Sequence, residues 1–160
     1  KDFGNEQIPN VMEKKKLSRY HAIHDINRRI SQNISNALHC RTKMILMGFD
    51  ETNLSERLKL YYGYVNATRE EYSTEYRCND ADAQLLKNMA YVEHERWIAS
   101  HKLMGYTVAP ETDFVKKHHK CMCTWDELDK KTQSYDCRVV DTTIKIEYQK
   151  ALEENKKAKV

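Results

Sequence analysis

Glycine and proline are scarce in this chain of 160 residues, which holds four glycines and two prolines. Sandwiches and barrels need a turn roughly every ten residues, and their turns draw on these two residue types. The scarcity therefore argues against an all-β fold. Abundant lysine, glutamate, leucine, methionine and tyrosine instead favour helices. We predict a mainly α fold, built as a pseudo-twofold pair of helical half-repeats with a few short strands in the connecting loops.

Long apolar runs are missing as well. The longest, Met44–Phe49, is far too short to cross a bilayer, and no signal peptide opens the chain. The five cysteines are an odd number in a chain longer than most disulfide scaffolds, which indicates a reducing, cytoplasmic setting. The formal charge of +3 is too small to predict nucleic-acid binding. Composition thus argues against a membrane span, a secreted disulfide scaffold and a nucleic-acid partner.

The sequence pattern divides the chain into four segments. In chain order these are an entry loop over 1–13, a degenerate half-repeat with its connection over 14–80, the main domain over 81–153 and a solvated tail over 154–160. Gly4 and Pro9 indicate the entry loop, because both disfavour a helix interior. Because the chain begins at Lys1 without a methionine, we expect it to be a piece of a longer protein with an upstream domain.

Two helices are predicted in the second segment. The first runs from Lys14 to Gly48, a glycine placed where helices commonly end. Serine and asparagine at 31–33 favour a break in it, because these residues suit helix caps better than helix interiors. The second is a short helix over Leu54–Tyr64.

The clearest element is a helix from about Ala81 to Met104, closed by Gly105. Asn79 or Asp80 is suited to cap its first turn. Its apolar residues recur with helical period and predict one buried face. A loop with a strand-like stretch near 121–124 follows. A second long helix is expected to begin near Asp136, as its N-cap. The predicted core comprises Leu86, Ala90, Trp97, Met104, Val140 and Ile144.

The densest polar cluster is Glu93-His94-Glu95-Arg96-Trp97. Glu93 and Arg96 fall on the apolar arc of their helix, and a buried carboxylate is costly unless it is paired. One interpretation is a structural role for Glu93, as a buried ion pair with an arginine or a hydrogen bond to a loop amide. In the other, Glu93 and His94 face a pocket and hydrogen-bond a ligand, while Trp97 offers a flat face on which a ring can stack.

The sequence contains no motif typical of a metal site or a catalytic site. His118, His119, Cys121 and Cys123 are zinc-ligand types, but a Cys-x-Cys step in a strand points the two thiols to opposite faces. We therefore predict no metal. A glycine-rich phosphate loop, a dinucleotide fingerprint, a nucleophile elbow and a zinc-protease motif are all missing. No cofactor is predicted.

The second half of the chain resembles the RyR domain, the repeat module of ryanodine receptors that also occurs in bacterial and phage proteins. The resemblance covers Leu86 to about Leu152. Its anchors are Met89 to Trp97, Leu103-Met104-Gly105-Tyr106, Pro110, His119-Lys120-Cys121-Met122, Trp125-Asp126-Glu127-Leu128 and Tyr135-Asp136. Residues 31–48 are similar to the degenerate half-repeat that often precedes this module in prokaryotic members.

The resemblance implies a cytosolic, non-catalytic and regulatory module that is similar to a nucleotide-responsive domain. We accordingly expect a non-enzymatic sensor of a small ligand of the adenine-nucleotide type, with an upstream domain or a second copy as its protein partner. The predicted ligand-binding residues are Glu93, His94, Arg96, Trp97, Tyr106, His119, Lys120 and Trp125. An adenine-type ring would stack on the Trp97 and Trp125 side, and the basic run over 116–120 would supply positive charge for phosphate.

Two alternatives stay open at this point. In the first, the chain is a structural protein–protein interaction module in which Glu93 and Arg96 only brace their helix. In the second, it is a hydrolase or transferase acting on a nucleotide derivative, with Glu93 and His94 as acid and base.

Overall fold

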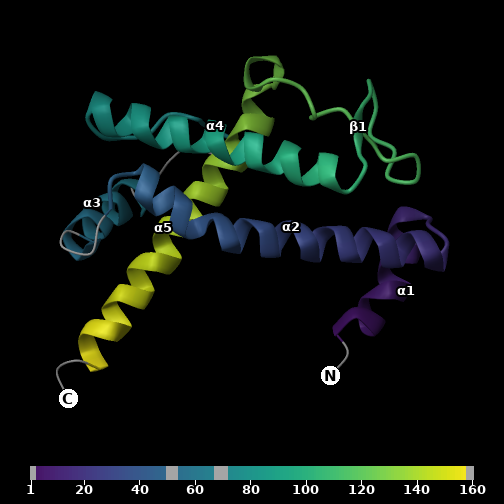
Figure 1. Cartoon of the computed structure of the whole chain (residues 1–160), viewed down its shortest axis with the longest axis horizontal. Helices are drawn as coiled ribbons and strands as arrows, with labels where there is room; N and C mark the ends of the chain where they lie inside the picture. The colour runs from purple at the N-terminus through teal and green to yellow at the C-terminus, as the bar shows by residue number, and fades with distance from the viewer. Residues whose placement is uncertain (1–2, 50–53, 67–71, 158–160) are drawn as a thin grey trace. The chain divides into compact units, whose positions relative to one another are not determined.

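The computed structural model of the chain describes residues 3–49, 54–66 and 72–157. In this part the fold is mainly α, as predicted, with short strands in a connecting loop (Figure 1). The elements in chain order are α1 (Phe3–Lys15), α2 (Arg19–Leu46), α3 (Leu54–Asn66), α4 (Asp80–Leu103), β1 (Thr107–Val108), β2 (His118–His119), the 3-10 turn η1 (Trp125–Glu127) and α5 (Lys130–Lys157). The pseudo-twofold relation between half-repeats stays a prediction. Parts of the predicted connection and tail, 67–71 and 158–160, lie outside the described residues.

The chain forms two compact units. Unit 1 comprises residues 1–39 and 97–123, and unit 2 comprises residues 40–96 and 124–160. Helices α2 and α4 each contribute residues to both units. The two units are described separately below.

The prediction of an entry loop over 1–13 is wrong, because residues 3–15 form helix α1, with Pro9 inside it. Ile8 is buried against Ala22 and Ile26 of α2, with Val11 and Met12 packed beside it. An interior proline costs about 3 kcal/mol, whereas each fully buried aliphatic side chain contributes about 1.5–3 kcal/mol. Burial of this apolar face therefore offsets the cost of Pro9 in unit 1.

The predicted break at 31–33 is wrong, because helix α2 is continuous from Arg19 to Leu46. Ser31 and Asn33 are exposed, so their side chains extend into solvent. Between them, the Gln32 amide Nε2 donates a hydrogen bond of 3.1 Å to Ser100 Oγ and thereby ties this turn of α2 to α4 within unit 1.

The predicted glycine ends of α2 and α4 are confirmed. Gly48 and Gly105 have φ angles of 74° and 81°, in the left-handed region where glycine carries no steric penalty. After α2, the Gly48 N–H donates to the Ile45 carbonyl at 2.9 Å and the Phe49 N–H to the Met44 carbonyl at 3.0 Å. This pair of bonds is the Schellman pattern of helix termination.

The core of unit 2 lies between α3, α4 and α5. Its fully buried side chains include Leu58, Tyr61, Leu86, Ala90, Cys137, Val140 and Ile144. The predicted core residues of α4 and α5 are therefore buried here, whereas Trp97 and Met104 are half-buried in unit 1. The predicted helix over 54–64 is confirmed as α3, and Asn79 caps α4 by accepting a 3.0 Å hydrogen bond from the Asp82 N–H.

Two local predictions around the 104–136 segment are wrong. The strand is at His118–His119, paired in parallel with Thr107–Val108, and not at 121–124. The Cys121 N–H donates to His119 Nδ1 and the Met122 N–H to the His119 carbonyl, so the chain turns there. Asp136 is not an N-cap, because α5 begins at Lys130 and Asp136 lies in its second turn.

Asp129 is the cap of α5. Its Oδ1 accepts a 2.9 Å hydrogen bond from the Thr132 N–H, and its Oδ2 accepts one of 2.8 Å from the Thr132 hydroxyl. We expect Asp129→Ala to lower the free energy of unfolding by about 1 kcal/mol, measured by urea denaturation. Asp126→Ala, which removes an exposed carboxylate just before the helix, is the control and should have a much smaller effect. Equal losses in the two variants would contradict the capping role.

Candidate functional site

A pocket of about 300 Å³ opens in unit 1. One wall is α2, and the other is the segment from the end of α4 to β2. The residues of the wall that bear on its chemistry are Tyr20, His24 and Arg28 from α2 and Tyr106, Phe114 and Lys117 from the second segment. The pocket therefore combines aromatic rings with cations.

The α2 wall follows from helical spacing. Tyr20, His24 and Arg28 are four residues apart, so they lie on one face of the helix. The rings of Tyr20 and His24 contact each other edge to face, with centroids 4.4 Å apart. Such spacing gives a helix face with a ring at one end and a guanidinium at the other.

Arg28 is held in place from two sides. Its Nη2 donates a 2.9 Å hydrogen bond to Asp25 Oδ1, and its guanidinium carbon lies 4.6 Å from the centre of the Phe114 ring. Within the described residues its Nε–H, which is buried, has no hydrogen-bond partner. The fixed guanidinium therefore keeps one donor unused.

The carboxylate of Asp25 does not neutralise the cations around it. Besides Arg28, Lys15 Nζ lies 2.9 Å and Arg29 Nε 3.4 Å from its oxygens, so three cations share one anion. Burial raises the pKa of Asp25, but the hydrogen bonds from Lys15 and Arg28 outweigh it, and the net shift is downward. Asp25 therefore stays ionised at neutral pH, and the cluster keeps an excess of positive charge.

The second wall contains Tyr106, the one predicted site residue that lines the pocket. Tyr106 is buried, and this burial raises the pKa of its hydroxyl, so the hydroxyl keeps its proton and can donate a hydrogen bond. Lys117 has a φ angle of 56°, unusual for a residue with a side chain, and its Nζ donates a 2.9 Å hydrogen bond to the Met104 carbonyl. The ammonium group is thus fixed at the pocket wall.

Trp97 and His119 lie in unit 1 and do not line the pocket. The Trp97 ring is 3.9 Å from that of His101 and 4.8 Å from that of His119, while His119 contacts Phe114 edge to face. Burial, followed by the nearby His101, lowers the pKa of His119 to about 4. His119 is therefore neutral at neutral pH and supplies no charge for phosphate. Lys120 is exposed.

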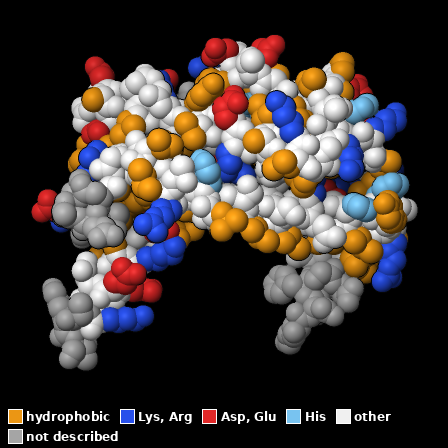
Figure 2. Space-filling model, in the orientation of Figure 1, with side chains coloured by type: hydrophobic (Ala, Val, Ile, Leu, Met, Phe, Trp, Pro, Cys, Tyr) orange, Lys and Arg blue, Asp and Glu red, His pale blue; other side chains and the backbone are white. Residues whose placement is uncertain are grey.

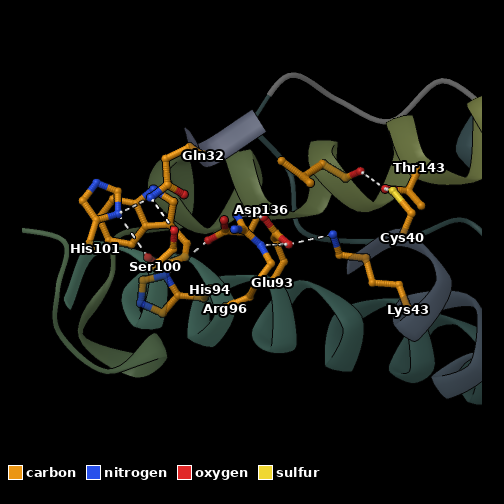
Figure 3. Close-up of polar contacts among 12 residues, drawn as sticks. Gln32, Cys40, Lys43, Glu93, His94, Arg96, Ser100, His101, Asp136 and Thr143 are labelled. Atoms are coloured by element: carbon orange, nitrogen blue, oxygen red, sulfur yellow. Dashed lines mark hydrogen bonds and ion pairs between the residues drawn. The ribbon is translucent and has the colours of Figure 1, made fainter. Parts of the chain in front are cut away.

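In unit 2, Glu93 is the centre of a buried ion cluster (Figure 3). Its Oε2 lies 2.7 Å from Lys43 Nζ, and Arg96 donates to both of its oxygens, at 2.9 Å from Nε and 2.6 Å from Nη2. The Lys43 side chain is 0% exposed and that of Glu93 2%. The predicted need of Glu93 for a partner is therefore met by two cations, one of them from α2.

His94 and Asp136 form a second contact of unit 2, also drawn in Figure 3. His94 Nδ1 lies 3.4 Å from Asp136 Oδ2, and the His94 ring contacts that of Trp125 edge to face. Burial raises the pKa of Asp136, and the hydrogen bond with His94 only partly counters this rise. Trp125 also contacts Tyr91, and its carbonyl accepts a 2.8 Å hydrogen bond from Gln133.

The predicted site residues are thus divided between the units. Tyr106, Trp97, His119 and Lys120 belong to unit 1, and Glu93, His94, Arg96 and Trp125 belong to unit 2. Three residues of the pocket wall were not predicted as site residues: Tyr20, Arg28 and Phe114. The four-residue spacing of Tyr20, His24 and Arg28 was the available signal, whereas nothing in the sequence pairs Phe114 with them.

The described residues include no group of three or more His, Cys, Asp or Glu side chains arranged to hold a metal ion. None of their helices combines the length and the apolarity that crossing a membrane requires. In comparisons with known proteins, no family model, curated protein or solved structure matches this chain. The resemblance to the RyR domain stays a prediction.

Proposed function

We propose that the chain is a non-enzymatic regulatory module of the RyR type, which senses a nucleotide-type small molecule through the pocket of unit 1. The observation that carries this proposal is the combination, at one pocket, of the rings of Tyr20, Tyr106 and Phe114 with the cations of Arg28 and Lys117. Aromatic rings stack on a nucleobase, and cationic side chains bind a phosphate group. The proposed stacking site is therefore formed by these three rings and not by Trp97 and Trp125.

The charge of unit 1 supports an anionic ligand. Its residues include eleven Lys and Arg against six Asp and Glu, a net charge of +5, while the whole chain carries +3. A cleft in a positive region concentrates anions and raises their rate of association.

The volume of the pocket limits the size of the nucleotide that it can hold. Small-molecule pockets range from about 300 to 1,000 Å³, and this pocket is at the lower end. A mononucleotide therefore suits it better than a dinucleotide. Base stacking contributes about 1–3 kcal/mol, and with two charge-assisted contacts to phosphate this supports micromolar affinity.

The structural alternative is supported by one observation of its own. Glu93 is fully paired with Lys43 and Arg96 and braces α4 within unit 2, as the interpretation of a purely structural module requires. An acid–base role for Glu93 has no such support, because both carboxylate oxygens are already engaged by these cations.

Lys117→Gly is the variant that tests the proposal most directly. Glycine suits the left-handed backbone at this position, so removal of the strain offsets the loss of the Met104 contact and we expect little change in melting temperature. A hydrogen bond to a charged group contributes about 1.5–3 kcal/mol, so affinity for the nucleotide should fall about tenfold or more.

The measurement is calorimetric titration of the full chain with AMP, ADP, ATP, cyclic AMP and ADP-ribose. Lys120→Ala, which removes an exposed lysine that does not line the pocket, is the matched control and should bind like the wild type. Absence of binding for all five nucleotides at millimolar concentration would exclude the proposed function. Loss of binding in Lys120→Ala but not in Lys117→Gly would place the ligand elsewhere.

A further inference from the structure

His119 holds the turn after β2 through a hydrogen bond that only a neutral imidazole accepts. The backbone N–H of Cys121 donates to His119 Nδ1, with the two nitrogens 3.2 Å apart. A ring nitrogen that accepts from an N–H carries no proton, so the single proton of this ring is on Nε2. A second proton can bind only at Nδ1, where it would face the Cys121 N–H. Protonation of the His119 ring is therefore incompatible with this turn.

Three other rings surround this imidazole within unit 1. The ring centroids of Trp97, His101 and Phe114 lie 4.8, 5.4 and 6.0 Å from that of His119. Trp97 and His101 belong to α4, and Phe114 belongs to the loop between β1 and β2. A flip of the His119 ring in place would remove Nδ1 from the Cys121 N–H but leave the imidazolium among the same rings. The charged ring recovers its full hydration only when the loop moves away from α4.

The charged surroundings of His119 are positive. The titratable groups close to its ring are His101 on α4, Arg28 on α2 and Lys120, the next residue of the chain. Asp25, the carboxylate beside Arg28, is already shared by three cations. Figure 2 shows Lys, Arg and His side chains gathered at the end of unit 1 where α1, the start of α2 and this loop lie. In the described part of unit 1, an imidazolium at position 119 would therefore lie among cations without a counter-ion.

We propose that protonation of His119 opens the loop between β1 and β2, so that mild acid disrupts the pocket wall that this loop forms. The link to the pocket is Phe114, which lines it and lies edge to face against His119. The Arg28 guanidinium lies over the same Phe114 ring, so the two walls of the pocket meet at this side chain. Acid then weakens nucleotide binding as well, and this consequence alone rests on the proposed function.

The pH range of the opening follows from the shifted pKa of His119. Burial, followed by His101, Arg28 and Lys120, lowers this pKa from 6.5 to about 4. Well above pH 6.5 the ring is neutral whether the loop is closed or open, so the proton has no effect. Below pH 6.5 the open loop binds a proton that the closed loop does not, and closure is lost progressively until the pH reaches about 4. Between pH 7 and pH 5 the equilibrium shifts toward the open loop about tenfold or more.

Hydrogen exchange of the full chain measures this opening without any ligand. The reporters are the amides of Cys121, which donates to His119 Nδ1, and of Asp113, which donates to the His118 carbonyl and closes the loop. Each exchange rate is divided by the intrinsic rate of an unfolded peptide at the same pH, which gives a protection factor that reports opening alone. We expect both protection factors to fall about tenfold or more between pH 7 and pH 5.

His119→Asn is the variant that separates the proton from the side chain. Its amide oxygen takes the place of Nδ1 as an acceptor for the Cys121 N–H but does not titrate in this range. Loss of the ring contacts lowers protection at every pH, but the protection factors should change less than about twofold between pH 7 and pH 5. His118→Gln is the matched control, because it removes the neighbouring half-buried histidine of β2, which points to the opposite face. It should keep the wild-type dependence on pH.

A nuclear magnetic resonance titration of the wild type needs no variant, and it decides the case if His119→Asn does not fold. We expect an unprotonated Nδ1 at pH 7 and a pKa of about 4 for His119. A His119 pKa of 6.5 or above, or a protection factor of Asp113 that does not fall toward pH 5, would overturn the proposal. So would a fall that persists in His119→Asn or is abolished in His118→Gln. Opening in acid by a chain that binds none of the nucleotides would support this proposal and exclude only the proposed function.

Discussion

Replacement of Glu93 by glutamine is expected to lower the free energy of unfolding by about 3–5 kcal/mol. The substitution keeps the shape of the side chain but removes the negative charge between Lys43 and Arg96. The Lys43 side chain is 0% exposed, so its ammonium cannot reach water to recover solvation in the folded state. Removing one partner of a buried ion pair costs several kcal/mol, much more than the loss of an exposed ion pair.

Urea denaturation of the wild type, Glu93→Gln and Glu95→Gln gives the measurement. Glu95 is exposed on the same helix, so Glu95→Gln is the control and should change stability by about 0.5 kcal/mol or less. If the loss comes from the buried charge of Lys43, adding Lys43→Met to Glu93→Gln should restore a large part of it, because a buried pair can be replaced by apolar side chains of similar volume. A double variant less stable than Glu93→Gln would contradict this explanation.

The second large effect is expected for Asp25→Asn in unit 1, a loss of about 2 kcal/mol at neutral pH. The charge-assisted bonds from Lys15 and Arg28 are each stronger than bonds to a neutral amide. The figure is smaller than for Glu93 because Lys15 and Arg29 are partly exposed and solvent screens their attraction.

The dependence on pH follows from the lowered pKa of Asp25. The folded protein holds the charged form more strongly than the unfolded chain, whose pKa is near 3.8, so this stabilisation is fully present above that pH. It is lost as the pH falls through the lower pKa of the folded state. The difference in stability between the wild type and Asp25→Asn should therefore be largest above pH 4 and shrink in more acidic buffer. A stability difference that stays constant down to pH 2 would contradict this origin. Glu111→Gln, at an exposed position of unit 1, is the control for the loss of a carboxylate.

Elements with a strong local signal were predictable from the sequence. Gly48 and Gly105 end helices because glycine adopts a left-handed backbone without penalty, and Asn79 caps α4 because its side chain reaches an amide three residues on. These features depend on neighbours in the chain. The continuity of α2 and the helix over residues 3–15 depend instead on packing between helices. The helix propensities of Pro9 and Ser31 carry no information about this packing.

The start of α5 was missed for a different reason. Its first turns are polar, and the apolar period begins only at Cys137, so Asp136 has the pattern of a cap. In the structure Gln133 and Ser134 are buried there, and Gln133 donates to the Trp125 carbonyl. Buried polar side chains that donate to backbone carbonyls give no hydrophobic signal, and the true cap, Asp129, lies seven residues before Asp136.

The candidate site was only partly predictable. The apolar arc around Glu93 correctly indicated that its carboxylate needs a partner, because an unpaired buried charge is costly. The identity of Lys43 as a partner depends on the packing of α2 against α4 within unit 2, fifty residues apart in sequence. In the same way, Tyr106 was predicted, but Phe114 meets Arg28 only through the fold.

If the pocket binds a nucleotide as proposed, we expect the loop between β1 and β2 to determine how quickly that ligand enters or leaves. It is closed by backbone hydrogen bonds from the Thr107 N–H to the Lys117 carbonyl and between Asp113 and His118, and it carries Phe114 and Lys117. Such short ladders open locally, at a lower free energy than global unfolding. We therefore expect the amides of Thr107, Asp113 and His118 to exchange with deuterium before those of the buried residues of α5, and the proposed nucleotide to slow their exchange selectively. The residence time of the proposed ligand would then depend on this loop and not on the helical core.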